Sequence, residues 1–209
     1  MKILIVDDHA VIHHGLRRIL ADEFEGAVFG EACQSQEALD LVSHESWDVV
    51  ILDIGLPGRG GLDVLKQIRA ARPKLPVIIF SMHSVEQFGV RALKAGASGY
   101  LAKESAPDQM VIAIRKVLSG GKYISMDLAE KLAGSLAHDP SLEPDELLSD
   151  REFEILLMIA MGKTTTAIAD QLSLSIKTVS TYRTRIMEKL QLKTGSELIR
   201  YALDRGLDR

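Results

Sequence analysis

The sequence predicts an α/β fold, a doubly wound parallel sheet of five strand–helix units, followed by a small all-α domain of four helices. Two observations predict it. Between residue 1 and about residue 121, short β-branched apolar runs alternate five times with helix-like segments, which is typical of a parallel sheet covered on both faces. From residue 149 onward, only helical patterns occur.

The predicted strands are short apolar runs bounded by turn residues. They lie near 2–6, 28–32, 49–52, 77–81 and 99–102. The predicted helices follow them in alternation. They lie near 11–22, 35–43, 62–72, 85–95 and 107–119. We therefore assign residues 1–121 to a first domain.

Residues 122–145 differ in composition and predict a linker. Leu128, Leu132 and Leu136 recur every fourth residue, which allows one short amphipathic helix. The acidic stretch 138–146 is punctuated by prolines, as flexible connections between domains often are.

Residues 146–209 form the second predicted domain. Ser149 and Glu152 have the spacing of a capping box, so a helix should begin there and end at Gly162. The remaining predicted helices lie near 165–172, 176–190 and 195–206.

Composition restricts the function classes. The 209 residues are 46% hydrophobic and 26% charged, and no apolar run approaches the ~18 residues that a membrane helix needs, so no membrane partner is expected. The chain begins with a short strand instead of a signal peptide. Its single cysteine, Cys33, cannot form an internal disulfide, which favours a cytoplasmic location.

The net charge of −4 is unevenly distributed. Residues 145–209 hold ten basic and ten acidic side chains, so the first 144 residues carry the whole net charge. Within 173–200, six basic residues face only two acidic ones. A local basic stripe of this kind is one electrostatic sign of a nucleic-acid partner.

Polar residues follow four of the predicted strands at their carboxyl ends. In an open parallel sheet these ends meet at one edge, where ligands bind. The sequence therefore predicts a site that gathers three carboxylates, a hydroxyl and an ammonium group. These are Asp7, Asp8, Asp53, Ser81 and Lys103.

This set suits a divalent cation and a phosphoryl group. Mg²⁺ prefers oxygen ligands, which Asp8, Asp53 and the backbone carbonyl near Gly55 could supply, while Asp7 orients a bound water. Asp53 could also attack phosphorus and hold it as an acyl phosphate. Lys103 and the cation would then neutralise the phosphoryl oxygens, and Ser81 could donate a hydrogen bond to one of them.

The segment 176–190 has two distinct helical faces. Val179, Ile186 and Leu190 line up on an apolar face that should pack inward. The opposite face carries small hydroxyl residues that could approach base edges in a major groove, with basic residues placed to reach phosphates. The candidate DNA-binding residues on and after this helix are Lys177, Thr178, Ser180, Thr181, Thr184, Arg185, Lys189 and Lys193.

The first 120 residues resemble the receiver domain of two-component response regulators. The matching features are the paired acids Asp7-Asp8, Asp53 followed by Leu56-Pro57-Gly58, and the later Ser81, Tyr100 and Lys103. This resemblance implies a flavodoxin-like (βα)5 fold and Mg²⁺ or Mn²⁺ as cofactor. It also implies that Asp53 is the phosphoacceptor, that a sensor histidine kinase is the donor, and that Tyr100 is a switch residue that turns inward as Ser81 moves.

Residues 146–207 resemble the LuxR-type helix-turn-helix of the NarL/FixJ response regulators. The resemblance is carried by Leu148-Ser149 and Arg151-Glu152, then Gly162-Lys163, Ile168-Ala169 and Thr178-Val179. Departures occur at Thr165-Thr166-Ala167 and Tyr182. The resemblance implies a bacterial transcription regulator that binds double-stranded DNA as a homodimer when phosphorylated, with 176–190 as the recognition helix.

Two rival functions come from other classes. An aspartyl-phosphate phosphatase would place a second Asp two residues after the nucleophile, where this chain has Gly55, so we do not expect an enzyme. A regulator controlled by protein binding would use the acidic residues only structurally. Of the six histidines, His9 and His13 lie at helical spacing, but no metal site is predicted around them and we expect them to be solvated.

Overall fold

The protein is described by a computed structural model of residues 1–209, except residues 58, 127, 131, 133–146 and 208–209. It divides into two compact units, 1–136 and 137–209. The expected helix at 122–145 is partly visible: residues 126, 128–130 and 132 are helical, whereas Leu136 and the acidic stretch 138–146 lie outside the described residues.

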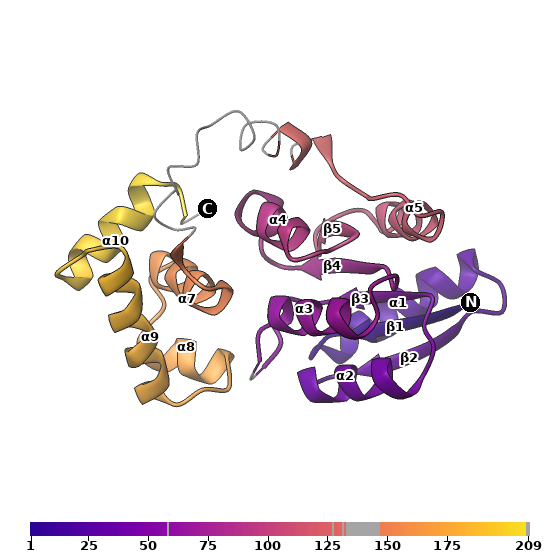
Figure 1. The fold of residues 1–209 in the computed structure, drawn as a ribbon, viewed down its shortest axis with the longest axis horizontal. Helices are drawn as coiled ribbons and strands as arrows, with labels where there is room; N and C mark the ends of the chain where they lie inside the picture. Colours follow the sequence, from indigo (N-terminus) through magenta and orange to yellow (C-terminus); the bar gives the residue numbers. More distant parts are fainter. Residues whose placement is uncertain (58, 127, 131, 133–146, 208–209) are drawn as a thin grey trace. The chain divides into compact units, whose positions relative to one another are not determined.

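The first unit is the predicted doubly wound sheet (Figure 1). All strand pairs are parallel and the spatial order is β2-β1-β3-β4-β5. The strands are β1 (Lys2–Val6), β2 (Val28–Ala32), β3 (Val49–Leu52), β4 (Val77–Ser81) and β5 (Gly99–Ala102). The fold class and the strand positions predicted from sequence are confirmed.

Helices cover both faces of this sheet. Their bounds are α1 (Ala10–Glu23), α2 (Ser35–His44), α3 (Gly61–Ala71), α4 (Val85–Lys94) and α5 (Pro107–Leu118). Helices α1 and α5 pack on one face, where Leu20 and Ile114 join Ile5 and Ile51 in one buried cluster. Helices α2, α3 and α4 lie on the other face (Figure 1). Burial on both faces explains why the strand sequences are continuously apolar.

The chain continues past α5 along the edge of the sheet. Tyr123 forms an isolated parallel bridge with Gly99, and its backbone N–H donates to the Ser98 carbonyl. Leu128 is fully buried and lies so close to Gly89 of α4 that a Cβ there would be 2.6 Å from Leu128 Cδ1. The start of the predicted linker therefore packs on the first unit.

The second unit contains the four predicted helices, α7 (Asp150–Ala160), α8 (Thr165–Gln171), α9 (Ile176–Lys189) and α10 (Gly195–Asp204). A hydroxyl residue caps the start of each one: Ser149, Thr164, Ser175 and Thr194 accept a hydrogen bond from the N3 backbone N–H. Ser149 and Glu152 form the predicted capping box.

The core of this unit lies on the predicted face of α9. Val179 and Ile186 are buried there, and Leu190 is 8% exposed at its end. Ile176, at the edge of that face, remains half exposed at 52%. The helix therefore turns its hydroxyl and basic residues to solvent, as its periodicity predicted.

Among the described residues, no helix is both long and apolar enough to cross a membrane.

Candidate functional site: an acidic rim and an exposed helix

Strand register gathers three carboxylates at one edge of the sheet. Val6 of β1 pairs with Leu52 of β3, so Asp7 and Asp53 leave neighbouring strands at the same level. The Asp53 backbone N–H donates to the Val6 carbonyl at 2.9 Å. We call Asp7, Asp8 and Asp53 the acidic rim. It lies where the strand order reverses between β1 and β3, which is where such sheets bind ligands.

Lys103 lies across the rim and pairs with two of its carboxylates, so its single positive charge offsets one of their two negative charges. Its ammonium nitrogen lies 2.6 Å from Asp7 Oδ2 and 2.8 Å from Asp53 Oδ2, and all three side chains are at most 5% exposed. The sequence brought these residues together only by strand ends, whereas the structure joins them in one buried ionic network.

Burial governs the charge state of this network. Desolvation raises the pKa of Asp53 above the ordinary carboxyl range, and Lys103 opposes that shift. Burial alone would lower the pKa of Lys103, but the two neighbouring carboxylates outweigh it and the pKa is raised. Lys103 therefore stays charged, while burial disfavours the ionised form of Asp53.

One oxygen of Asp53 is left for an incoming group. Asp53 Oδ1 is buried and has no hydrogen-bond partner, while Oδ2 is bound to Lys103. Both Asp7 oxygens are already used, Oδ2 by Lys103 and Oδ1 by the backbone and ring of His9. The donors available to a cation are thus Asp53 Oδ1 and Asp8, with Asp7 held behind them. This arrangement fits Mg²⁺, which takes few carboxylates.

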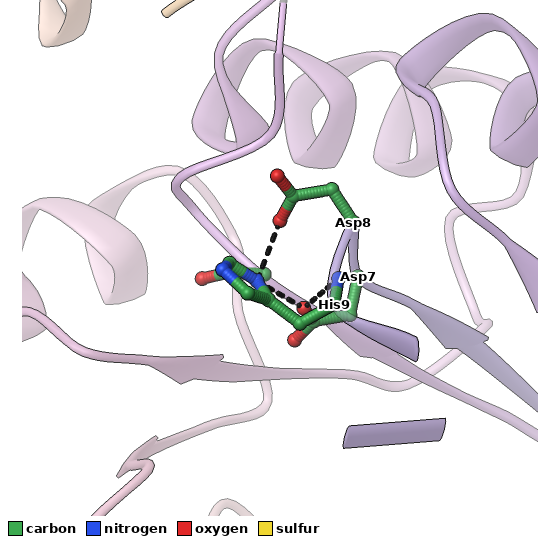
Figure 2. Close-up of side chains that lie close together, drawn as sticks. Asp7, Asp8 and His9 are labelled. Atoms are coloured by element: carbon green, nitrogen blue, oxygen red, sulfur yellow. Dashed lines mark hydrogen bonds and ion pairs between the residues drawn. The ribbon is translucent and has the colours of Figure 1, made fainter. Parts of the chain in front are cut away.

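The sequence analysis missed His9. Its ring Nδ1 lies 3.0 Å from Asp7 Oδ1 and 2.7 Å from Asp8 Oδ1 (Figure 2). One ligand atom from each of Asp7, Asp8, His9 and Asp53 lies within 4.8 Å of all the others. Acidic partners that we did not expect therefore surround this histidine, while the expectation of no metal site there stays a prediction. His9 directly follows the paired acids, and that adjacency was the signal available.

The prediction that His13 is solvated was wrong. His13 is 2% exposed, and its Nε2 lies 2.6 Å from the Asp7 backbone oxygen. His13 therefore stabilises the loop after β1, which holds Asp7 and Asp8. The helical spacing of His9 and His13 could not reveal that one points inward and the other outward.

Two glycines bring backbone close to Asp53. A Cβ on Gly55 would lie 3.5 Å from Asp53 Oδ2, an ordinary contact, so the predicted approach of this backbone is present although glycine is not required for it. A Cβ on Gly61, which the sequence analysis missed, would lie 2.1 Å from the Asp53 backbone oxygen. Only glycine fits where α3 begins. Gly58 lies outside the described residues.

Ser81 and Tyr100 are joined through one residue of the β4–α4 loop. The His83 backbone N–H donates to Ser81 Oγ at 3.3 Å, and the Tyr100 hydroxyl donates to the His83 carbonyl at 2.8 Å. Tyr100 is 1% exposed, so its ring already lies inward. The His83 backbone therefore links the Ser81 and Tyr100 side chains through two hydrogen bonds.

The candidate DNA-binding residues lie on the exposed side of α9. Lys177, Ser180, Thr181, Thr184 and Arg185 are all exposed. The three hydroxyls donate to carbonyls of their own helix, as Ser180 Oγ does to the Ile176 oxygen at 2.9 Å. They therefore offer lone pairs and small volume to a groove, with their protons already engaged.

The other candidates differ in their surroundings. Thr178 belongs to the cap of α9, where its N–H donates to Ser175 Oγ. Lys189 donates to Glu152 Oε2 at 2.6 Å and to the Leu147 carbonyl at 3.2 Å, so it fastens α9 to the start of α7. Lys193, after the helix, is exposed.

Family models match both units. Residues 3–115 match the response regulator receiver domain, and residues 146–202 match the bacterial regulatory proteins of the luxR family. The chain belongs to the two-component response regulators. It combines a receiver domain with a LuxR-type DNA-binding domain, which confirms the resemblance to the NarL/FixJ type and excludes the phosphatase rival.

Curated relatives match almost the whole response regulator. Response regulator UvrY of Escherichia coli K12 is 38% identical over 208 residues, which cover 99% of this chain and 95% of that protein. Response regulator GacA of Pseudomonas aeruginosa PAO1 is also 38% identical, with 99% and 97% covered.

Solved structures agree with this assignment. RcsB of Salmonella enterica serovar Typhimurium, bound to the rprA promoter in the presence of the phosphomimetic BeF3−, is similar with a TM-score of 0.65 and 28% identity. The match covers 96% of this chain and 97% of that one. A LuxR-family response regulator from Aurantimonas sp. SI85-9A1 is 36% identical with a TM-score of 0.59, covering 66% of this chain and 98% of that one.

Proposed function

We propose that this response regulator accepts a phosphoryl group from a sensor histidine kinase on Asp53. Asp53 Oδ1, buried and without a hydrogen-bond partner between the other acidic residues, is the single observation that carries the proposal. Oδ1 would form the new bond to phosphorus while the bond to the kinase imidazole breaks and the electron pair leaves with that nitrogen. Lys103, already beside Asp53, would contact the phosphoryl oxygens.

The proposed cofactor is Mg²⁺ or Mn²⁺. The Asp53 carboxylate, Asp8 and the Gly55 backbone would hold it, and Asp7 would orient a water ligand. Bound there, the cation would offset charge on the phosphoryl oxygens. Two observations support these ligands: Asp53 Oδ1 has no hydrogen-bond partner, and other acidic residues lie close to it.

An apolar pocket of about 260 Å³ adjoins Lys103 and supports a protein partner on this side. It lies between α1 and α5, and its lining includes Val11, which is 82% exposed. We propose that the kinase approaches Asp53 here. Cys33 is exposed and free, which fits the cytoplasmic location that a kinase-linked regulator requires.

We also propose that phosphorylation shifts a pre-existing equilibrium toward DNA binding. The phosphoryl group adds ~1.5–2 negative charges, which would attract Ser81 and, through His83, repack Tyr100. In the shifted state two chains would pair and place their α9 helices in successive major grooves, about one helical turn apart. Lys177, Arg185, Lys189 and Lys193 would reach phosphates, and Thr178, Ser180, Thr181 and Thr184 would face the groove. In one solved structure, two RcsB dimers are bound to two parallel DNAs, which supports a dimer for this related chain.

A phosphodonor assay tests this function. The full chain is incubated with acetyl phosphate and Mg²⁺, and intact mass and binding to a random DNA pool are measured. We expect one added phosphoryl group and tighter DNA binding in the wild type and in Asp22→Asn, an exposed control. Asp53→Asn should lose both effects. Phosphate-dependent DNA binding that survives in Asp53→Asn would contradict the proposal and favour control by protein binding.

A further inference from the structure

His9 stands at the solvent side of the acidic rim, where its side chain is 62% exposed, and has no role in the proposed phosphoryl transfer. We propose that His9 is a further ligand of the cation at this rim, so that the site accepts ions that prefer imidazole, such as Zn²⁺, beside Mg²⁺. This inference rests on the metal site of the proposed function and adds one nitrogen ligand to it.

The backbone holds His9 in the position that a ligand needs. His9 is the residue before the first turn of α1, with φ −97° and ψ 108°, and its N–H donates to Asp7 Oδ1 at 2.9 Å. This conformation turns the ring back over the acids, so that Nδ1 lies between the carboxylates of Asp7 and Asp8 (Figure 2). The ring is thus placed by hydrogen bonds at both the backbone and the side chain.

The donor atoms lie close together, with Nδ1 of His9 now paired to the carboxylates, so that small side-chain movements would let one ion take the place of these pairs. With bonds of ~2.1 Å, adjacent octahedral ligands lie about 3 Å apart. Nδ1 lies 2.7 Å from Asp8 Oδ1 and 3.0 Å from Asp7 Oδ1, and all four candidate donors lie within 4.8 Å of one another. A cation among these atoms would take the place of a proton on Nδ1, since metals bind neutral imidazole.

An independent observation points into the same space. Asp53 Oδ1 is buried in a side chain that is 4% exposed, and it has no hydrogen-bond partner. Buried carboxylate oxygens are rarely left in this state unless an ion or water completes them. The His9 side chain is 62% exposed and Asp8 is 32% exposed, so an ion can enter from that side.

Nitrogen ligation changes which ions the site prefers. Carboxylates and carbonyls suit Mg²⁺ and Mn²⁺, whereas imidazole suits Zn²⁺, Ni²⁺ and Cu²⁺. The carboxylates of Asp8 and Asp53 alone would favour the first group. A site that includes His9 binds Zn²⁺, Ni²⁺ and Cu²⁺ more tightly and still binds Mg²⁺ and Mn²⁺. The side chain at position 9 therefore determines which ions the site prefers.

Mn²⁺ bound to the full-length protein provides a direct spectroscopic test. Pulsed electron paramagnetic resonance detects the ¹⁴N nucleus of a ligating imidazole. We expect ¹⁴N modulation in the wild type and in His14→Gln, and its loss in His9→Gln. His14 is the matched control because it is an exposed histidine of the same helix whose Nδ1 is bound to the Ala10 carbonyl.

Displacement of Mn²⁺ tests the selectivity. Zn²⁺ should displace Mn²⁺ from the wild type at a concentration lower by about tenfold or more than from His9→Gln, the loss usual when a partner of a metal site is removed. Mg²⁺ should displace it equally from both. Because Mn²⁺ is observed, Zn²⁺ bound at other histidines does not affect the result.

The outcomes separate this inference from the proposed function. Mn²⁺ that binds without ¹⁴N modulation, or with modulation that persists in His9→Gln, overturns the role of His9 and leaves the oxygen-ligand site intact. Mn²⁺ that fails to bind, or that binds equally well to Asp53→Asn, overturns the proposed metal site and His9 with it.

Discussion

The acidic rim and the exposed face of α9 differ in how strongly their polar side chains are buried and held by neighbouring residues. At the rim, Asp7, Asp53 and Lys103 are almost fully buried and hold one another in fixed positions. On α9, Ser180, Thr181 and Thr184 are exposed and hydrogen-bond only to their own helix. A group that must react needs a defined charge state and low dielectric, while a surface that must meet DNA needs room and positive charge.

This difference predicts that substitutions at the rim change stability and function together. Substitutions on the exposed face of α9 should change DNA binding alone, except at Lys189, which also binds Glu152 of α7. Four substitutions test this difference, from the largest expected change in free energy to the smallest.

Lys103→Met should have the largest effect, because it leaves Asp7 and Asp53 buried together without their counter-charge. We expect the free energy of unfolding of the first unit to fall by about 3–5 kcal/mol, measured by urea denaturation. The loss should shrink as the pH is lowered, since Asp53, whose pKa is raised by burial, takes up a proton and loses its charge. Lys74→Met, at an exposed lysine, should remain close to the wild type.

Gly61→Ala should follow, because the new Cβ would overlap the Asp53 backbone oxygen. We expect a loss of about 1–3 kcal/mol in unfolding free energy and slower phosphorylation by acetyl phosphate, since the displaced backbone carries Asp53. Gly15→Ala is the control, because nothing lies within 4 Å of its added Cβ and alanine favours helix α1. Equal stability of the two variants would refute the steric argument.

Lys189→Met tests a candidate DNA contact that also supports the fold. Its removal leaves Glu152, whose side chain is 4% exposed, without its ammonium partner, and should cost about 1 kcal/mol because Lys189 itself is 40% exposed. Lys189 and the Ser149 cap hold the pKa of Glu152 below the usual range against its burial. This pair therefore stabilises the wild type above the ordinary Glu pKa, and that contribution is lost as pH falls. As the pH is lowered into the acidic range, the free energy of unfolding of the variant should therefore fall less steeply than that of the wild type.

Lys177→Ala should leave stability within about 0.5 kcal/mol, because the side chain is exposed at the start of α9. DNA binding should weaken for all sequences alike, and the slope of log affinity against log salt should fall by about 0.9, one phosphate contact. Fluorescence anisotropy at several salt concentrations measures this. An unchanged slope would remove Lys177 from the phosphate-contacting set.

Most of the fold could be predicted because it depends on local pattern. The apolar runs at 2–6 and 49–52 and the cap at Ser149 lie within a few residues of what they determine. Asp7, Asp53 and Lys103 were found for a related reason, since strand ends of one parallel sheet must meet. The direction of the His9 ring, the burial of His13 and the contact of Gly61 with Asp53 were not predictable, because each joins groups whose approach depends on tertiary packing.

The sequence by itself determined the order of strands and helices along the chain, the carboxyl-end positions of the acidic residues and the apolar face of α9. Hydrophobic periodicity and turn chemistry depend on residues that are close together along the chain, so they can be recognised in the sequence. Only the tertiary structure decided which oxygen of Asp53 is left without a partner, that Lys103 pairs with two carboxylates at once, and that His9 lies beside them. These depend on ångström-scale distances between side chains from separate strands and loops, which no linear pattern records.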